Sequence, residues 1–195
     1  KLIKNPISRI EVASAGGYLS YENIADKATV AGVEIEIRKN LFVRPLSSAA
    51  NGMNKLSFGL NGSYIYTNAK MPLATVTTGS QLEGAAPWIA NFDLSHNFTK
   101  GNHSFINTLV LNYVSDKIYT IGTQGYQDIM EQGMMTLDFV SQAKLNKYVS
   151  LTLKARNLLN PSYKLSRKAN ENGEKVILND YKKGINISLG VSCTF

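Results

Sequence analysis

The sequence predicts an all-β fold whose antiparallel strands form part of a transmembrane β-barrel, and three observations predict it. Long stretches alternate between apolar and polar or small residues, which is the period of a strand with one apolar and one wet face. The connections between these stretches alternate between short and long, as expected of a barrel with short turns at one membrane surface. The sequence has no run of about 18 apolar residues that could form a membrane-spanning helix.

The clearest strand lies at the end of the chain, in residues 183–195. Every second residue is apolar, and the intervening residues are small or polar, with Gly184 and Asn186 the first of them. A membrane-spanning strand needs roughly 9–11 residues with this alternation. The apolar members are Ile185, Ile187, Leu189, Val191, Cys193 and Phe195.

Composition is compatible with this prediction. The chain has 195 residues, 44% of them hydrophobic, and a formal charge of +7. A barrel has the average composition of a soluble protein because half of each strand faces water. Lys and Arg are scattered, so we expect solvated loops and a wet lumen, and no nucleic-acid partner. The lone Cys193 allows no internal disulfide, and the first residues lack the apolar core of a signal peptide, so we expect a removed signal or a start inside a longer protein.

Eight strands are expected along the chain, the first of them weak. Residues 1–12 contain Pro6 and alternate poorly, so they are expected to be an incoming strand whose partner is absent from this sequence. The segment 103–118 is ambiguous because apolar residues occupy both of its faces, which a lumen strand covered by a plug would tolerate. The expected strands are 1–12, 27–38, 55–66, 88–98, 103–118, 134–144, 148–157 and 183–195. The segments expected to be loops or turns are 13–26, 40–54, 67–87, 99–102, 119–133, 146–147 and 158–182.

Charged and amide side chains mark one face of these strands. Two carboxylates and a guanidinium in one row cannot lie unpaired in a dry core, so a water-filled lumen is expected to receive them. Tyr64 and Tyr66, at one end of an apolar face, suit the aromatic belt of a membrane interface. The candidate lumen-facing residues are Glu34, Glu36, Arg38, Asn91, Asp93, Asp138, Lys154 and Arg156.

Three stretches together resemble TonB-dependent receptors. They are YENIADKATVAGVEIEIRKNL at 21–41, LEGAAPWIANFDLSH at 82–96, and NLLNPSYKL at 157–165, which is followed by YKKG and the terminal strand. Glu83 and Ala85 depart from the family pattern, as do Ser192 and Cys193, where an aromatic residue is frequent. The family's plug and TonB-contacting box have no counterpart here, so the chain is not expected to transport by itself.

The resemblance implies that residues 1–195 are a single partial domain, the C-terminal part of a roughly 22-stranded outer-membrane barrel. It implies Gram-negative origin and uptake of siderophore-bound iron, cobalamin, a glycan or a peptide. It implies as partners the outer-membrane lipid, the remainder of the receptor and the TonB complex, and it leaves open a surface lipoprotein. It also implies that Phe195, with Val191 and Leu189, belongs to a membrane-assembly signal.

No enzyme, metal or cofactor site is expected. His96 falls in the lipid-facing register and His103 beside a turn, so neither suits a Ser-His-acid unit. Glu34 and Glu36 are expected to pair with neighbouring Lys or Arg across the lumen wall rather than to hold a metal.

Two alternatives remain open. One is a complete eight-stranded barrel with a structural or adhesive role, which requires a first strand able to pair with the last. The other is a soluble β-sandwich or lipid-binding barrel, which predicts polar residues on the face assigned to lipid. The terminal strand has none on that face.

Overall fold

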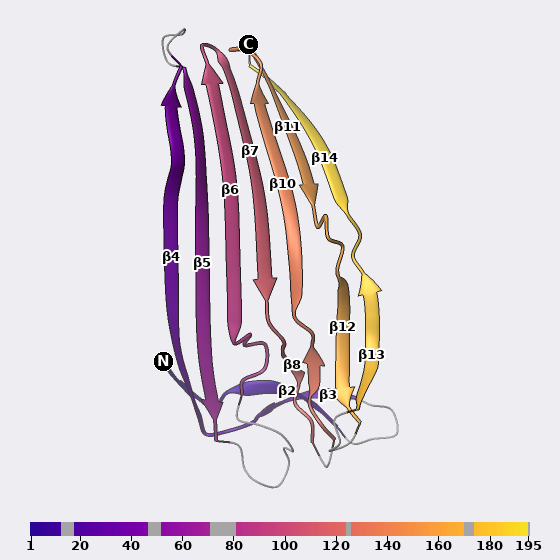
Figure 1. The fold of residues 1–195 in the computed structure, drawn as a ribbon. Helices are drawn as coiled ribbons and strands as arrows, with labels where there is room; N and C mark the ends of the chain where they lie inside the picture. The colour runs from indigo at the N-terminus through magenta and orange to yellow at the C-terminus, as the bar shows by residue number, and fades with distance from the viewer. Residues whose placement is uncertain (13–17, 47–51, 71–80, 124–125, 170–173, 195) are drawn as a thin grey trace.

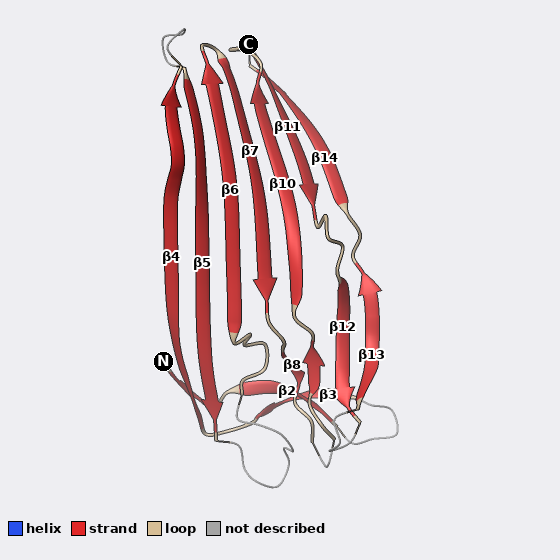
Figure 2. Cartoon of the chain, viewed as in Figure 1, coloured by secondary structure: helices blue, strands red, loops and turns tan. Residues whose placement is uncertain are grey.

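The computed structural model describes residues 1–12, 18–46, 52–70, 81–123, 126–169 and 174–194, which form strands joined by turns (Figures 1 and 2). Among these residues no helix is long and apolar enough to cross a membrane. The strands are β1 (Leu2–Lys4), β2 (Ile7–Glu11), β3 (Leu19–Asn23), β4 (Lys27–Pro45), β5 (Met53–Ala69), β6 (Trp88–Lys100), β7 (His103–Val114), β8 (Lys117–Thr120), β9 (Ile129–Glu131), β10 (Met134–Lys144), β11 (Val149–Arg156), β12 (Ser162–Lys168), β13 (Lys175–Lys182) and β14 (Asn186–Cys193).

One large antiparallel sheet dominates the fold. Its order is β1-β4-β5-β6-β7-β10-β11-β14. The short turns between long strands lie at one end, and the long connections lie at the other (Figure 1). The sheet is open: within the described residues β14 has a partner on one edge only, and β4 beyond Val30 likewise. This disfavours the complete eight-stranded barrel, in which the first and last strands would pair.

The register of the sheet separates an apolar face from a polar face, as the alternation predicts. Two neighbouring rows across β4, β5, β6, β7 and β10 show the division. The first row is Ile37, Leu60, Phe92, Leu111 and Leu137. The second row is Glu36, Asn61, Asn91, Asn112 and Thr136.

The terminal strand follows the same division. Leu189 pairs with Leu153 and Val191 with Leu151, while Ser188 pairs with Lys154 on the opposite face. Leu189 is 71% exposed, and no second sheet covers this face among the described residues. A soluble sandwich would bury such a surface, and an exposed apolar face of this kind is compatible with contact to lipid.

Two expected loops are wrong, because the segments 119–133 and 158–182 contain strands. β8 and β9 pair with each other, and β12 pairs with both β9 and β13, giving the four-stranded order β13-β12-β9-β8. Register shifts interrupt the pairing beside Tyr119 and again where Leu178 is left out of the ladder. A bulge puts an extra residue into a strand, so strict alternation is lost and the segment does not have the sequence pattern of a strand.

The prediction for the N-terminal segment is also wrong. β1 pairs with β4, so this segment has a partner within the chain, and Leu2 lies opposite Thr29. β2 pairs with β3, which falls in the expected loop 13–26, and this hairpin lies across the long-loop end of the sheet (Figure 1). These segments form strands because they pair with β4 and with each other. Local alternation does not reveal which segments pair.

A small hydrophobic core lies where this hairpin meets the sheet. Ile10 and Ile24 from the hairpin region pack with residues from β4, β5 and the end of β8. Ile10 also forms a parallel bridge with Ile121, which attaches β2 to the end of β8. The other core members are Ala25, Ala28, Ala69, Ile118 and Ile121.

The strands are interrupted between β11 and β12 and, at the same level, between β13 and β14. This interruption, formed by residues 157–160 and Gly184, is called the joint. Asn157 and Asn160 adopt positive φ, and Gly184 opposite them has φ +86°. The Asn157 side chain donates to the Gly184 carbonyl at 2.7 Å, and the Gly184 amide donates to Asn160 Oδ1 at 3.0 Å. Asn tolerates left-handed backbone better than other residues with a side chain, which explains the Asn-Leu-Leu-Asn sequence of this motif.

Replacing Gly184 by Ala is expected to destabilise the protein by about 1–2 kcal/mol, because a Cβ is strained in the left-handed region. Gly190→Ala is the matched control, since the nearest atom to its new Cβ would lie at 3.9 Å. Unfolding of both variants in detergent with increasing denaturant would measure the difference. Equal stability of the two variants would contradict the strain at the joint.

Candidate functional site: a polar sheet face and a pocket at the long-loop end

The polar face carries all eight candidate lumen-facing residues. The pairing register puts them on one side of the sheet. A shallow pocket of about 340 Å³ lies among Glu34, Glu36, Arg38, Asn91 and Asp93. These residues therefore share one face of the sheet, and the contact of this face with water stays a prediction.

Hydrogen bonds run across this face from strand to strand. Asn61 Nδ2 donates to Glu34 Oε1 at 2.7 Å, and Asn91 Nδ2 donates to Asn61 Oδ1 at 3.3 Å. The expected cation partner of Glu34 is thus replaced by an amide. Asn61 was missed as a candidate, and its place in register between Glu36 and Asn91 is the feature that could have identified it.

Glu36 does pair with a cation, but one on its own strand. Arg38 Nε donates to Glu36 Oε1, and Arg38 Nη1 lies 3.8 Å from Asp93 Oδ1 on β6. The Arg38 side chain is 70% exposed, so these ion pairs contribute little stability. Its guanidinium is accessible to a ligand or to another part of the protein.

The remaining polar candidates lie on β10 and β11. Asp138 Oδ1 accepts the Asn157 backbone amide at 2.8 Å and so helps to hold the joint. Lys154 lies opposite Ser188, and Arg156 lies opposite Asn186, both on the polar face. Of the proposed assembly residues, Leu189 and Val191 lie on the apolar face, and Phe195 lies outside the described residues.

Apolar side chains interrupt the polar face near β7. Val110 pairs with Asp93 on one side and Asp138 on the other, and Ile89 pairs with Val114. These positions are half-buried. The apolar positions on this face near β7 include Ile89, Ile106, Val110, Val114, Met134 and Val140.

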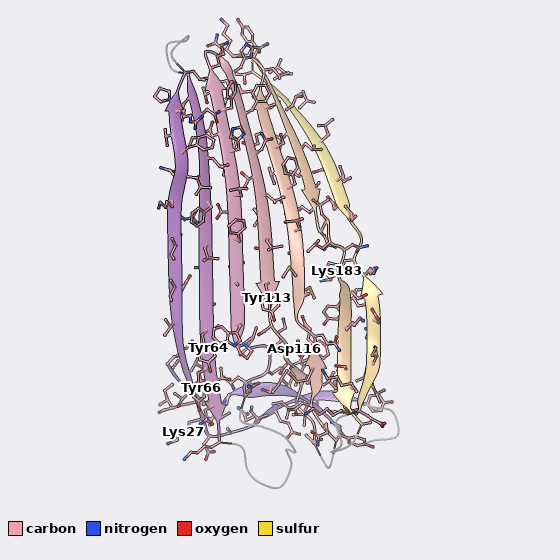
Figure 3. All side chains as sticks on the ribbon, viewed as in Figure 1. Lys27, Tyr64, Tyr66, Tyr113, Asp116 and Lys183 are labelled. Atoms are coloured by element: carbon pink, nitrogen blue, oxygen red, sulfur yellow. The ribbon has the colours of Figure 1, made fainter. Side chains whose placement is uncertain are left out.

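A larger pocket, of about 470 Å³, opens at the long-loop end. Arg167, Lys168 and Lys175 from β12 and β13 contribute positive charge, and Asp116 and Asp128 contribute carboxylates. Asp116 lies just beyond β7 (Figure 3) and accepts the Gly133 amide at 2.6 Å. Asp128 accepts the Gly122 amide at 2.8 Å, so both carboxylates are fixed by backbone donors.

Two ion pairs attach the β2–β3 hairpin to distant segments beside this pocket. Arg9 Nη2 lies 2.9 Å from Glu83 Oε1, and Arg167 pairs with Glu11. Burial lowers the pKa of Arg9, but the hydrogen bond to Glu83 and the nearby Tyr119 outweigh it, so its pKa is raised. Sequence reasoning could not find these pairs, since the partners lie 74 and 156 positions apart.

Tyr163 on β12 is a further titratable group at the long-loop end. Burial, followed by the charge of Glu131 and the hydrogen bond to it, raises the pKa of Tyr163 to about 12. A phenol with a raised pKa stabilises the fold below its ordinary pKa of 10.0, and this contribution is lost as pH rises through about 12. The four-stranded sheet is therefore expected to keep this contribution throughout neutral pH.

Among the described residues, no three His, Cys, Asp or Glu side chains lie close enough to hold a metal ion. His96 Nε2 is 2.8 Å from Asn54 Oδ1. The register places His96 on the apolar face beside Leu56 and Asn107, as the sequence predicts.

The apolar face has the height of a bilayer. Trp88 contacts Tyr64 at one end, with ring centroids 4.5 Å apart, and Phe98 contacts Phe105 at the other, at 6.5 Å. The ten steps from Trp88 to Phe98 span about 33 Å along β6, or about 25 Å across a membrane for a strand tilted by about 40°. This matches the apolar band, flanked by aromatic belts, of membrane barrels.

A curved antiparallel sheet with one lipid-compatible face, one hydrogen-bonded polar face and long connections at one end is the wall of a transmembrane β-barrel. The chain belongs to the TonB dependent receptor-like, beta-barrel family, whose model matches residues 1–158. None of the curated proteins and no solved structure matches the chain. The strands β12, β13 and β14 lie wholly beyond the matched residues, yet β14 continues the same sheet in register with β11.

Proposed function

We propose that this chain forms C-terminal wall strands of an outer-membrane receptor that takes up a scarce nutrient with energy from the TonB complex. The observation that carries the proposal is the hydrogen-bonded polar face, which lies back to back with an apolar face of bilayer height in a chain of this family. Siderophore-bound iron, cobalamin, a glycan or a peptide are the ligand classes proposed. The role proposed is transport, not catalysis.

The open edges support the partial-domain proposal for residues 1–195. β4 beyond Val30 and the free edge of β14 present unpaired backbone groups, which in lipid must find partners. Further strands of a roughly 22-stranded barrel would supply them.

The apolar positions on the polar face support a plug as partner. Val110 and Val140, with Ile106 nearby, interrupt a surface that a water-filled lumen would keep polar. A plug packed against β6, β7 and β10 would cover them. A surface lipoprotein partner would instead contact the long-loop end, where the β2–β3 hairpin and β13 lie.

A growth experiment tests the proposed function. Cells lacking the protein are grown with iron, cobalamin, a glycan or a peptide as the limiting nutrient, and a defect is expected on one of the four. The wild-type gene should restore growth, and loss of TonB should abolish that restoration. A defect on none of them, or a restoration that does not need TonB, would contradict the proposal.

The pocket variants supply a second arm of the same experiment. Replacing Lys168 and Lys175 by Glu reverses two charges of the pocket, and we expect weaker uptake of an anionic ligand at low concentration. Lys182→Glu is the matched control, because Lys182 is an exposed β13 residue outside the pocket.

A further inference from the structure

The apolar face is hollowed near the long-loop end of β4, β5 and β6. The groove there has a volume of about 480 Å³ and an almost wholly apolar lining. Its floor is low because Gly62 pairs with Ala90, and a Cβ at Gly62 would meet no atom within 4 Å. Its walls include Val33, Ile35, Tyr64 and Trp88. A groove with this apolar lining, on the face assigned to lipid, can receive a hydrocarbon chain.

A row of lysines lies on the same face, closer to the long-loop end. Lys4 on β1 lies directly opposite Lys27 on β4, and both are exposed. Lys70 directly follows Ala69, which pairs with Ala28, so it belongs to the same row. None of the three forms an ion pair with a described residue. Like charges directly opposite each other destabilise a sheet, so an anion that bridges them would relieve a repulsion built into the fold.

The lysine row lies on the long-loop side of the groove, beyond the aromatic end of the apolar band. Lys27 and Val33 share a face of β4 and lie six residues apart, about 20 Å along the strand and about 15 Å in depth for a strand tilted by about 40°. Val33 is level with Tyr64 and Trp88, the aromatic pair at the end of the apolar band, so the lysine row lies beyond this band on the side of the lipid headgroups. Figure 3 shows Tyr64, Tyr66 and Lys27 in this order toward the long-loop end of the first two long strands.

We infer that the lysine row and the groove form one binding site for a lipid with a phosphate headgroup in the leaflet nearer the long loops. Lys4, Lys27 and Lys70 hold the phosphate, Tyr64 and Tyr66 lie at the interface, and one acyl chain fills the groove over Gly62. The inference rests on the membrane location in the proposed function, but not on transport.

The test uses the complete receptor that contains this chain, purified in nonionic detergent and reconstituted into nanodiscs of equal phosphatidylglycerol and phosphatidylcholine. Native mass spectrometry then identifies the lipids that the protein retains. Enrichment of phosphatidylglycerol by about fivefold or more is expected for the wild type, since a single lysine near a membrane surface favours anionic lipid by about this factor.

The variants separate the two halves of the site. Replacing Lys4, Lys27 and Lys70 by Gln should abolish the enrichment, whereas the same change at Lys100, Lys144 and Lys147, near the short turns, should preserve it. Gly62→Leu should lower retention of the bound lipid by filling the groove, with no steric clash at its Cβ. Glycerol 3-phosphate should fail to displace the lipid, because it lacks the chain.

Several results would overturn the inference. Equal enrichment in the wild type and the Lys4, Lys27 and Lys70 variant would do so, as would displacement by glycerol 3-phosphate or an unchanged retention in Gly62→Leu. A wild type that does not enter nanodiscs and retains neither lipid would instead contradict the membrane location itself. Failure of the lipid-site inference and failure of the proposed membrane location therefore give different results.

Discussion

Phe92→Arg is expected to remove most of the folded protein from the membrane, whereas Asn91→Arg is expected to leave it there. Phe92 is midway along β6 on the apolar face, and its ring lies 6.4 Å from that of Phe58. An Arg at the bilayer midplane of a barrel costs about 2–4 kcal/mol. Asn91 is on the polar face beside Asn61, where a new cation would lie near acidic side chains.

The measurement for this pair is the amount of heat-modifiable protein in isolated outer membranes, together with unfolding in lipid vesicles. Phe92→Leu is the size control, and it should behave nearly as the wild type. Similar losses of folded outer-membrane protein for Phe92→Arg and Asn91→Arg would mean that both faces meet the same solvent, which would contradict the account.

Deleting Phe195 is expected to lower the amount of protein in the outer membrane sharply while leaving its synthesis unchanged. Phe195 completes the apolar series of the terminal strand, although it lies outside the described residues. We propose that it serves, with Val191 and Leu189, as the part of the strand that the assembly machinery binds.

Phe98→Ala is the matched control for this deletion, because it removes an aromatic ring from the apolar face near the short turns. If Phe195 contributed burial alone, its loss would cost about 1.5–3 kcal/mol at most, and both variants would show similar outer-membrane levels. Fractionation of cells making each variant separates the two outcomes. Equal levels would refute the assembly role.

Alternation predicted the long strands well because every residue of such a strand lies on either the apolar face or the polar face, and its type follows from that face. The bounds of 134–144 agree with β10, and Lys154 lies opposite Ser188 on the polar face as expected. The ends of strands were harder to predict. β4 runs to Pro45 and β5 begins at Met53, although this region contains residues typical of turns.

The extensions beyond the membrane were missed for a different reason. In β13, Val176, Ile177 and Leu178 are consecutive apolar residues, and the bulge there hides the period of two. The β2–β3 hairpin depends on Ile10 meeting Ile121, a contact between segments far apart in the sequence. Local pattern contains no information about such pairings.

The candidate site was predicted by residue type but not by partner. Glu34 and Asn91 were expected on a wet face, yet the amide of Asn61 that connects them follows only from the register. The ion pair of Arg167 with Glu11 and the lysine row of Lys4 and Lys27 likewise require the three-dimensional pairing. The sequence indicated which residue types lie on the polar face, whereas the contacts between particular side chains required the three-dimensional structure.

The central claim, that the apolar face meets lipid and the polar face meets water, is tested most directly by spin labels along β14. Single cysteines at positions 186 to 191, in a Cys193→Ser background, are labelled in the reconstituted protein, and their collisions with oxygen and with a water-soluble nickel chelate are measured. Labels replacing Ile187, Leu189 and Val191 should collide mainly with oxygen, and those replacing Asn186, Ser188 and Gly190 mainly with the chelate. Uniform accessibility along the strand, or the opposite alternation, would contradict the account.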